Sequence, residues 1–577
     1  MLSHSLSVEV LIWIYAAALS LGAGELRGPQ AAVPAAGGDS DGTAFRVTIR
    51  VDAARVHDEL RSIWRFFGAD EPNYATMKNG RKLLAELGDL APQRVYFRTH
   101  NLLTTGDGTP SLKWGSTNVY TAGVDGRVRY DWTIVDRIFD TYLAHKMKPL
   151  VEVGFMPEAL STHPQPYRHT FPSGSIFTGW SYPPSDYTKW GELIFQWARH
   201  VVDRYGRAEV ESWYWEVWNE PDIGYWHGTV EEYHKLYDFA AEGLKRALPA
   251  ARVGGPHVTS PNSARSQEFL RGFLEHCLRG TNFATGKTGS PLDYVGFHAK
   301  GAPRLVDGHV RMGLTNQLTA ISNGFSIVAS FPELQKTPII VGESDPEGCA
   351  ACSMRTNPEN AYRNGTLYAS YTAEQLARTY ELADLYQVNL AGAVTWAFEF
   401  ENQPYFAGFR DLATNGIAKP VLSVFRMLGR MGDSRVAAES SAGRSLASVR
   451  DRGVGDEPDI NALGSRSNRA IAILVWNYHD DEVPAQASKI ELKIDGIPVD
   501  RPTLEHYRID ADHSNAYEAW KKMGSPAQPS TEQYHALERA GQLERLEPPR
   551  VLEARAASVT VTFELPRQAV SFIKIGW

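Results

Sequence analysis

Two glutamates that lie far apart in the sequence each follow a segment expected to form a buried strand. Glu220 comes near the end of E-S-W-Y-W-E-V-W-N-E-P-D (211–222), and Pro221 ends that strand because proline has no N–H to donate. Glu343 follows three apolar residues and Gly342, which permits a close approach of the backbone. Because catalytic side chains of (β/α)8 enzymes lie at the carboxyl ends of the barrel strands, both carboxylates are candidates for catalysis.

The chemistry that suits such a pair is cleavage of a glycosidic bond, which needs two carboxyl groups of opposite protonation. Aromatic surroundings should raise the pKa of Glu220, so that it serves as acid and then as base, while Glu343 stays ionised as nucleophile. A separation of about 5–5.5 Å would mean retention of configuration, and about 6.5–9.5 Å would mean inversion. The alternatives are a Glu220 that only caps the next turn and a Glu343 that forms a structural salt bridge.

Further side chains are expected on the same rim, where they would bind the substrate. They are His100 and Asn101 after the second strand, Asn219, Tyr225 and Trp226 after the fourth, His298 at the end of the sixth, and Trp396 and Glu399 at the eighth. Asn219 is expected to bind the sugar 2-hydroxyl, an interaction that strengthens in the transition state. His298 would orient Glu343, bind sugar, or be a satisfied rim histidine. Tyr225 and Trp226 could equally pack within their loop.

Repeated strand–helix units position these residues and predict a parallel sheet. Eight units are present, with strands expected near 63–67, 94–98, 149–155, 213–218, 252–255, 294–298, 338–341 and 391–397. Eight units in roughly 370 residues are typical of a (β/α)8 TIM barrel, here assigned to 44–432, with generous loops.

The carboxyl-terminal part of the chain has a different pattern. From 433 to 577 the segments 470–478, 489–495 and 558–565 alternate apolar and polar residues, which predicts a smaller antiparallel β-sandwich. A strand over 45–51 precedes the barrel, and the sequence leaves open whether it pairs with this second domain.

The amino-terminal residues indicate export. Residues 1–24 contain an apolar run of signal-peptide length, and 25–43 are rich in Ala, Gly and Pro and read as a flexible tether. The protein is therefore expected to be secreted or periplasmic, without a stable membrane span. An uncleaved anchor or a misassigned start are the alternatives.

The composition narrows the possible partners. The net charge of −8 makes nucleic acid an improbable partner, and nothing in the sequence implies a metal or an organic cofactor. Of the three cysteines, Cys277 is expected to be a buried apolar residue, and C-A-A-C at 349–352 favours a disulfide over a metal site. The oligomeric state is not indicated.

The residues around Glu220 resemble glycoside hydrolase family 39. The resemblance rests on W-N-E-P-D (218–222) and the helix that begins G-T-V-E-E-Y-H-K-L-Y, together with G-A-D-E-P-N-Y-A (68–75), R-T-H-N (98–101), F-H-A-K-G (297–301) and H-S-N-A-Y (513–517). That family contains bacterial β-xylosidases and lysosomal α-L-iduronidases, all retaining enzymes. The resemblance implies Glu220 as acid/base and Glu343 as nucleophile.

The substrate is less sharply indicated. G-E-S-D-P around Glu343 is nearer the D-E-A-D-P of iduronidases than the T-E-W/Y-N form of many β-xylosidases, and Lys300 matches a lysine that iduronidases use on the uronate carboxylate. Alternatively Lys300 pairs with Asp345. The tail motif and the layout resemble the bacterial β-xylosidases, so a retaining, β-xylosidase-like hydrolase is predicted. The alternatives are hydrolysis of a uronic-acid-containing glycan and a non-catalytic protein of polysaccharide binding or biosynthesis.

Overall fold

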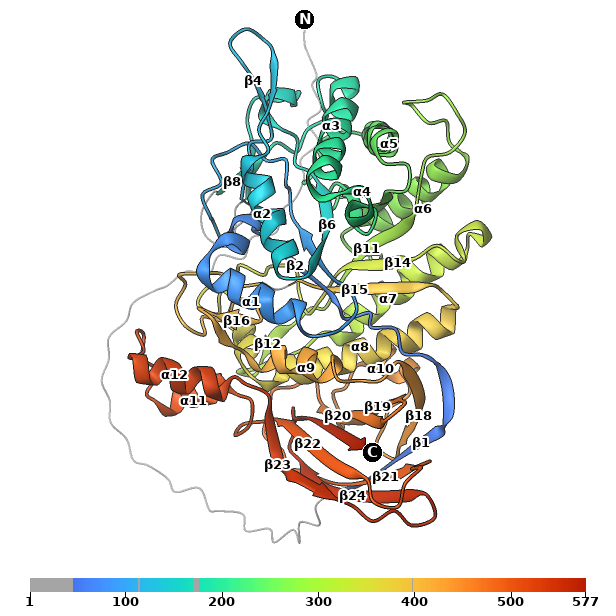
Figure 1. Ribbon diagram of the computed structural model, residues 1–577, viewed down its shortest axis with the longest axis vertical. Helices are drawn as coiled ribbons and strands as arrows, with labels where there is room; N and C mark the ends of the chain where they lie inside the picture. The colour runs from blue at the N-terminus through green and yellow to red at the C-terminus, as the bar shows by residue number, and fades with distance from the viewer. Residues whose placement is uncertain (1–44, 113–114, 170–175, 397) are drawn as a thin grey trace, which may run out of the picture. The chain divides into compact units, whose positions relative to one another are not determined.

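The computed structural model describes residues 45–112, 115–169, 176–396 and 398–577 (Figure 1). The expected signal peptide (1–24) and tether (25–43) lie outside the described residues. Among the helices that the structure describes, none is both long enough and apolar enough to cross a membrane.

Eight parallel strands close into a barrel, which confirms the predicted fold. In their order around the barrel they are β10 (Arg252–Val258), β11 (Tyr294–Lys300), β14 (Ile339–Asp345), β15 (Leu390–Trp396), β2 (Phe66–Ala69), β3 (Val95–Thr99), β6 (Met147–Val153) and β9 (Tyr214–Val217). Nearly every residue of these strands is buried, as expected where helices cover the outside and side chains fill the inside.

A helix follows each barrel strand and buries one apolar face against it. The helices are α1 (Lys78–Gly88), α2 (Thr133–Ala144), α3 (Tyr187–Tyr205), α5 (Val230–Ala247), α6 (Ala264–Arg279), α7 (Leu314–Ala329), α8 (Thr366–Tyr386) and α9 (Pro420–Leu428). The helix α5 begins with a capping box, in which the Thr229 hydroxyl and the Glu232 carboxylate each accept a backbone N–H. This cap ends the loop that carries Glu220 and so limits where that loop can lie.

Three strand boundaries differ from the sequence-based ones by three residues or more. The first strand begins at Phe66, three residues later than predicted, and the fifth continues to Val258. The seventh runs to Asp345, so Glu343 lies within the strand instead of directly after it. Polar residues continue the seventh strand because each finds a buried partner: Lys300 for Glu343 and Asp345, and two glutamines of α7 and α8 for Ser344. A search for apolar runs cannot foresee such partners.

The second domain is a nine-stranded sheet with a separate core. Its strands, in order, are β23 (Glu544–Val551), β22 (Thr503–Ile509), β25 (Val570–Gly576), β20 (Ala470–Tyr478), β19 (Asp459–Ser467), β18 (Ser434–Ser440), β1 (Arg46–Glu59), β21 (Ser488–Asp495) and β24 (Ser558–Leu565). Strands from both halves of this order contribute side chains to the same apolar cluster, including Val47, Ile473, Leu492 and Val561, so the sheet folds over a shared core as predicted for a sandwich.

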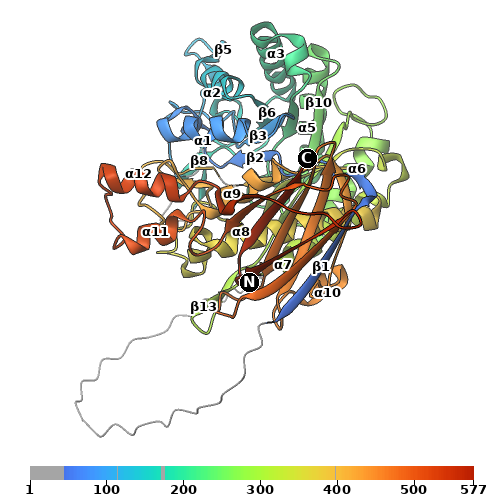
Figure 2. The ribbon, with the colours of Figure 1, turned by 60° about the horizontal axis from the view of Figure 1, so that its bottom comes forward.

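The amino-terminal strand β1 belongs to this sheet and not to the barrel. It pairs antiparallel with β18 and parallel with β21. Figure 2 shows β1, in blue, beside the orange strands of the carboxyl-terminal part of the chain. The two ends of the described chain therefore share one sheet. The pair β1–β21 can be parallel because β1 is far from β21 in the sequence, whereas strands joined by a short hairpin must be antiparallel.

Side chains on the second face of the sheet pack with the barrel. Leu474, Trp476 and Phe572 belong to the apolar cluster that contains the barrel core, and the Trp476 indole donates to Glu374 of α8.

The remaining elements are short. Four are helices: α4 (Arg207–Val210), α10 (Leu446–Arg452), α11 (Ala516–Lys522) and α12 (Thr531–Ala540). Four are 3-10 turns: η1 (Pro72–Thr76), η2 (Glu158–Leu160), η3 (Pro332–Leu334) and η4 (Pro358–Asn364). The others are the hairpins β4–β5 (Tyr120–Ala122, Val128–Tyr130), β7–β8 (Tyr167–His169, Ile176–Gly179), β12–β13 (Arg304–Val306, His309–Arg311) and β16–β17 (Ala413–Thr414, Ile417–Ala418).

Candidate active site

Glu220 lies just past the end of β9, on a backbone held in an unusual conformation. Trp218 and Glu220 have φ angles of 71° and 48°, in the left-handed region that bulky residues rarely adopt. The N–H of Glu220 donates to the carbonyl of His257 at 3.1 Å, and the Trp218 indole donates to the carbonyl of Tyr225 at 2.9 Å. Backbone strain of this kind persists where the surroundings over-determine it, and it concentrates at functional sites.

Glu343 lies on β14, where three cationic or hydrogen-bonding groups surround its carboxylate. Lys300 Nζ is 2.5 Å from Oε2, and Arg98 Nη1 and His100 Nε2 are 2.8 Å and 3.2 Å from Oε1. Arg98 and His100 come from β3 and its end, and Lys300 comes from β11. The carboxylate is therefore bound as an anion from several sides.

The structure brings the two glutamates together at the barrel mouth. One carboxylate oxygen of Glu220 lies within 4.8 Å of one carboxylate oxygen of Glu343. His298 stands between them, with its Nδ1 2.9 Å from Oε1 of Glu220 and 3.7 Å from Oε1 of Glu343. The side chain of Glu220 is 13% exposed and that of Glu343 5%. Both groups are thus largely sheltered from water.

The environments of Glu220 and Glu343 shift the pKa values of the two carboxyl groups in opposite directions. Burial, followed by the negative charge of Glu343, raises the pKa of Glu220 well above its usual value. Burial also acts to raise the pKa of Glu343, but Lys300, the bond from His100 and the charge of Arg98 outweigh it and hold that pKa well below its usual value. A proton shared between the two carboxyl groups is therefore favoured on Glu220.

Arg98 is a buried centre of this site that the sequence analysis did not assign. Besides Glu343 it donates to Glu216, with Nε 2.8 Å from Oε2, and to the amide oxygen of Asn219 at 2.8 Å. Its Nη2 also lies 3.1 Å from Glu152, and the side chain has no exposed surface. One guanidinium thus holds the proposed nucleophile and a residue next to Glu220 in a fixed relation.

A signal for this network was present in the sequence. Glu152 and Glu216 each interrupt an otherwise apolar strand, and a lone carboxylate in such a strand needs a buried partner. Burial raises the pKa of Glu216 to about 7 and raises that of Glu152 well above its usual value, in each case against the opposing charge of Arg98. The sequence did not show that one arginine would serve both.

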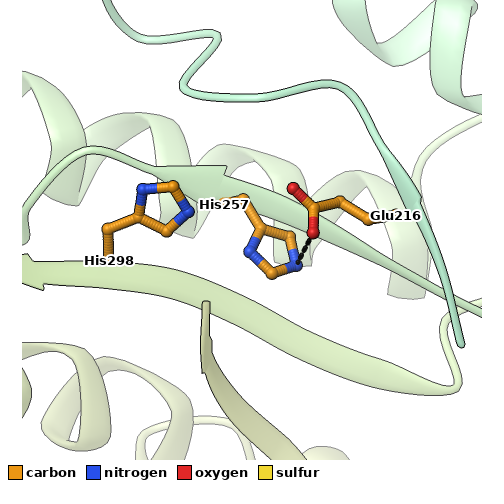
Figure 3. A group of neighbouring side chains, drawn as sticks. All are labelled: Glu216, His257 and His298. Carbon is orange, nitrogen blue, oxygen red and sulfur yellow. Dashed lines mark ion pairs between the residues drawn. The ribbon is translucent and has the colours of Figure 1, made fainter. Parts of the chain in front are cut away.

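His257 extends this buried network, and Figure 3 shows it between Glu216 and His298. Its Nε2 is 3.3 Å from Oε2 of Glu216, and burial lowers the pKa of both histidines well below the usual value. One atom from each of these three residues lies within 4.8 Å of the others, a donor set of the kind that binds transition metals. Arg98 already binds both oxygens of Glu216 and its charge opposes a cation there, so we assign no metal to this cluster.

Two amides of the predicted substrate-binding set have free hydrogen-bonding capacity. The side-chain nitrogen of Asn219 and both side-chain polar atoms of Asn101 are buried, and none of these three atoms has a hydrogen-bond partner among the described residues. The backbone N–H of Asn101, with φ of 50°, donates to Glu152 at 2.8 Å. Unpaired buried amides are costly unless a ligand or water completes them.

Lys300 and Trp396 meet at Asp345, which the sequence analysis considered only as an alternative partner of the lysine. Lys300 Nζ is 2.7 Å from Oδ2 of Asp345, and the backbone N–H of Trp396 donates to Oδ1 at 2.8 Å. The Trp396 indole donates to Asp70 at 2.8 Å, and its ring lies beside that of His100 with centroids 4.2 Å apart. Lys300 therefore pairs with both Glu343 and Asp345.

The remaining predicted substrate-binding residues, Tyr225, Trp226 and Glu399, differ in their surroundings. Tyr225 is half-buried, its carbonyl accepts the indole N–H of Trp218, and burial followed by the charge of Glu220 raises its pKa. Trp226 is 5% exposed and donates its indole to a carbonyl of its own loop. Glu399 accepts the N–H of Gly416, and burial raises its pKa to about 8. The contacts of Trp226 and Glu399 hold loops in place, and they do not bring either residue to Glu220 or Glu343.

Comparison with known proteins agrees with this geometry. The family model of glycosyl hydrolases family 39 matches residues 47–557. The chain belongs to this family. The resemblance found in the sequence is thereby confirmed, and the chain is a glycosidase for which a carbohydrate substrate is the fitting partner.

Members of this family with named activities are similar over most of their length. A "Beta-xylosidase" of Caldicellulosiruptor saccharolyticus is 27% identical over 433 residues, which is 73% of this chain and 78% of that protein. An "Alpha-L-iduronidase" of Homo sapiens is 27% identical over 528 residues, which is 85% of this chain and 73% of that protein. A crystal structure of a monomeric beta-xylosidase from Caulobacter crescentus matches the fold with a TM-score of 0.71 at 21% identity, covering 92% of this chain and 99% of that one.

Proposed function

We propose that this family 39 member is a retaining glycoside hydrolase with Glu220 as acid/base and Glu343 as nucleophile. The observation that carries the proposal is the approach of their carboxylate oxygens to within 4.8 Å. Retaining enzymes separate their two carboxyl groups by about 5–5.5 Å, whereas inverting enzymes leave about 6.5–9.5 Å for a water molecule. The opposite pKa shifts of the two groups support the same assignment.

The reaction then proceeds in two displacements. In the first, the Glu343 carboxylate attacks the anomeric carbon and forms a glycosyl ester, while Glu220 gives its proton to the departing oxygen. In the second, Glu220 takes a proton from water, the water oxygen attacks the anomeric carbon, and Glu343 leaves as a carboxylate. Asn219, whose side-chain nitrogen is buried without a partner, donates to the sugar 2-hydroxyl.

For the substrate we propose a neutral pentoside, cleaved as in the β-xylosidases among the relatives. The support is that Lys300, the cation next to Glu343, is already bound by two carboxylates, Glu343 at 2.5 Å and Asp345 at 2.7 Å. A uronate at this position would have to compete with both anions. The second candidate is a uronide, as in the α-L-iduronidases, and it is favoured by the presence of Lys300 itself within the site.

The test is a panel of nitrophenyl glycosides that includes a β-xyloside, an arabinoside and an α-L-iduronide. We expect turnover of the β-xyloside with retained configuration, loss of turnover in Glu343→Ala, and partial rescue by azide with a glycosyl azide of inverted configuration. Glu457→Ala, which removes a carboxylate that is 80% exposed, is the matched control and should keep full activity. Undiminished hydrolysis by Glu343→Ala would overturn the assignment, and no turnover of any glycoside by the wild type would favour a non-catalytic binding protein.

We also propose that the protein is exported. The disulfide between Cys349 and Cys352 supports this, because such bonds persist in oxidising compartments, and the apolar run in residues 1–24 supports it from the sequence. Mass spectrometry of the protein recovered from its native cells should find the amino terminus shortened. An intact amino terminus on protein from the cytosol would contradict the proposal.

A further inference from the structure

A cavity lies at the amino-terminal end of the barrel, away from the proposed catalytic pair. It has a volume of about 440 Å³ and is lined at the start of three barrel strands by Phe66, Tyr214 and Ala391. Because all barrel strands are parallel, their first residues lie at one end and Glu220 and Glu343 at the opposite end. The segment 428–433, which leads from α9 to the sheet domain, closes its other side.

Five arginines lie at this end of the barrel. Three of them, Arg61, Arg65 and Arg430, line its wall. The other two lie at the same end of the barrel, Arg94 directly before β3 and Arg252 as the first residue of β10. Arg252 lies over the Tyr214 ring, with Cζ 3.7 Å from the centroid. The guanidinium groups therefore converge on one end of the barrel.

Few of these arginines have an anionic partner. Arg252 donates to the backbone carbonyls of Ser212 and Trp213. Arg430 lies over the ring of Tyr507, with Cζ 4.6 Å from the centroid. Within the part of the chain that the structure describes, Arg65, Arg94 and Arg430 make no ion pair and no side-chain hydrogen bond, and the Nε of Arg65 is buried without an acceptor.

The acidic residues at the cavity do not balance this charge. Glu59 lies 3.7 Å from Arg61, and both side chains are more than half exposed, so this pair contributes little. The Asp433 carboxylate accepts the hydroxyl of Ser434 at 3.3 Å. Among the residues that line the cavity, two carboxylates thus accompany three guanidinium groups, and two of these, Arg65 and Arg430, make no ion pair among the described residues. Like charges in a cavity repel unless an anion is present.

We propose that this cavity binds a small oxyanion of the phosphate or sulfate type. The planar guanidinium presents paired N–H donors that match two oxygens of such a group, and the unpartnered Nε of Arg65 is available for one of them. The oxyanion is either a free ion or a sulfate or phosphate group carried on a sugar. The site is separate from the proposed catalytic pair, so hydrolysis does not depend on it.

The test uses orthophosphate and sulfate as probes, with sodium chloride added to keep the ionic strength constant. We expect a saturable rise in the melting temperature of the whole protein and a stoichiometry of one in calorimetry. Arg65→Gln and Arg430→Gln should each weaken binding by tenfold or more, while Arg127→Gln, which removes an arginine that is 86% exposed, should leave it unchanged. Hydrolytic activity should be unchanged in all three variants.

Two further measurements distinguish a free ion from a sugar-borne group and test the role of the planar guanidinium. A sugar sulfate that binds tighter than inorganic sulfate identifies a glycan-borne group, and weaker binding identifies the free ion. Arg65→Lys keeps the charge without the planar donor pair and should bind with intermediate affinity, which also covers the case in which Arg65→Gln fails to fold. A rise in melting temperature that sodium chloride reproduces, or binding that survives both glutamine substitutions, would overturn the proposal.

Discussion

Replacing Lys300 by Met should move the acid limb of the pH–rate profile to higher pH. Lys300 Nζ lies 2.5 Å from Glu343, and it is the first among the charges that hold the pKa of this carboxyl below its usual value against burial. A carboxylate with a depressed pKa is ionised, and active as a nucleophile, at pH values above that pKa. Activity is lost as the pH falls through it, and without Lys300 the loss begins at a higher pH.

The distance sets a ceiling on the size of this effect. At an effective dielectric constant of about 20, unit charges 2.5 Å apart interact by about 7 kcal/mol, which corresponds to about 5 pKa units. Lys300 also pairs with Asp345 at 2.7 Å, so only part of its charge acts on Glu343. Arg98, which is 2.8 Å from Glu343, is still present in the variant. We therefore expect a shift of about 1–3 units, as is typical for an opposite charge at close range.

The assay is kcat/KM for a nitrophenyl β-xyloside between pH 3 and pH 9, with circular dichroism at each pH to establish that the variant stays folded. Lys82→Met is the matched control, because this lysine pairs with Glu538 at the surface and lies in no contact with the catalytic pair. An acid limb that stays in place in a folded Lys300→Met protein would refute the view that Lys300 keeps Glu343 ionised. The alkaline limb, which follows loss of the proton from Glu220, should move less.

Two other predictions concern stability. Glu216→Gln leaves Arg98 without the carboxylate that binds it through two nitrogens, and we expect a loss of about 3–5 kcal/mol in the free energy of unfolding by urea. Glu152→Gln should cost much less, because burial raises the pKa of Glu152 and so disfavours its charged form. Equal losses for the two variants would contradict this reasoning. Replacing Cys349 and Cys352 by Ser together should lower the same free energy by about 2 kcal/mol with activity retained, since the disulfide closes a loop of only a few residues. Loss of hydrolysis in a stable double variant would show instead that the disulfide shapes the site.

The local pattern of the sequence determined the barrel, the boundaries of most strands and the two glutamates at its rim. Apolar periodicity and strand-terminating residues such as Pro221 act over a few neighbouring positions, so they can be read without knowing which segments meet. The motif around Glu220 identified the family for the same reason, because its residues are contiguous.

Tertiary structure alone decided which side chains converge. Arg98 reaches Glu216 and Glu343 from another strand, and Lys300 reaches Glu343 from a neighbouring one, so these contacts depend on barrel closure and not on spacing in the chain. Glu399 and Glu343 both lie near the carboxyl end of a barrel strand. The Glu399 carboxylate, however, accepts the N–H of Gly416 and so holds a loop. The pairing of β1 and the gathering of arginines at the opposite end of the barrel are long-range for the same reason. The local sequence predicts the strand end at which a side chain lies, and the chemistry of that side chain depends on the groups that the other strands place beside it.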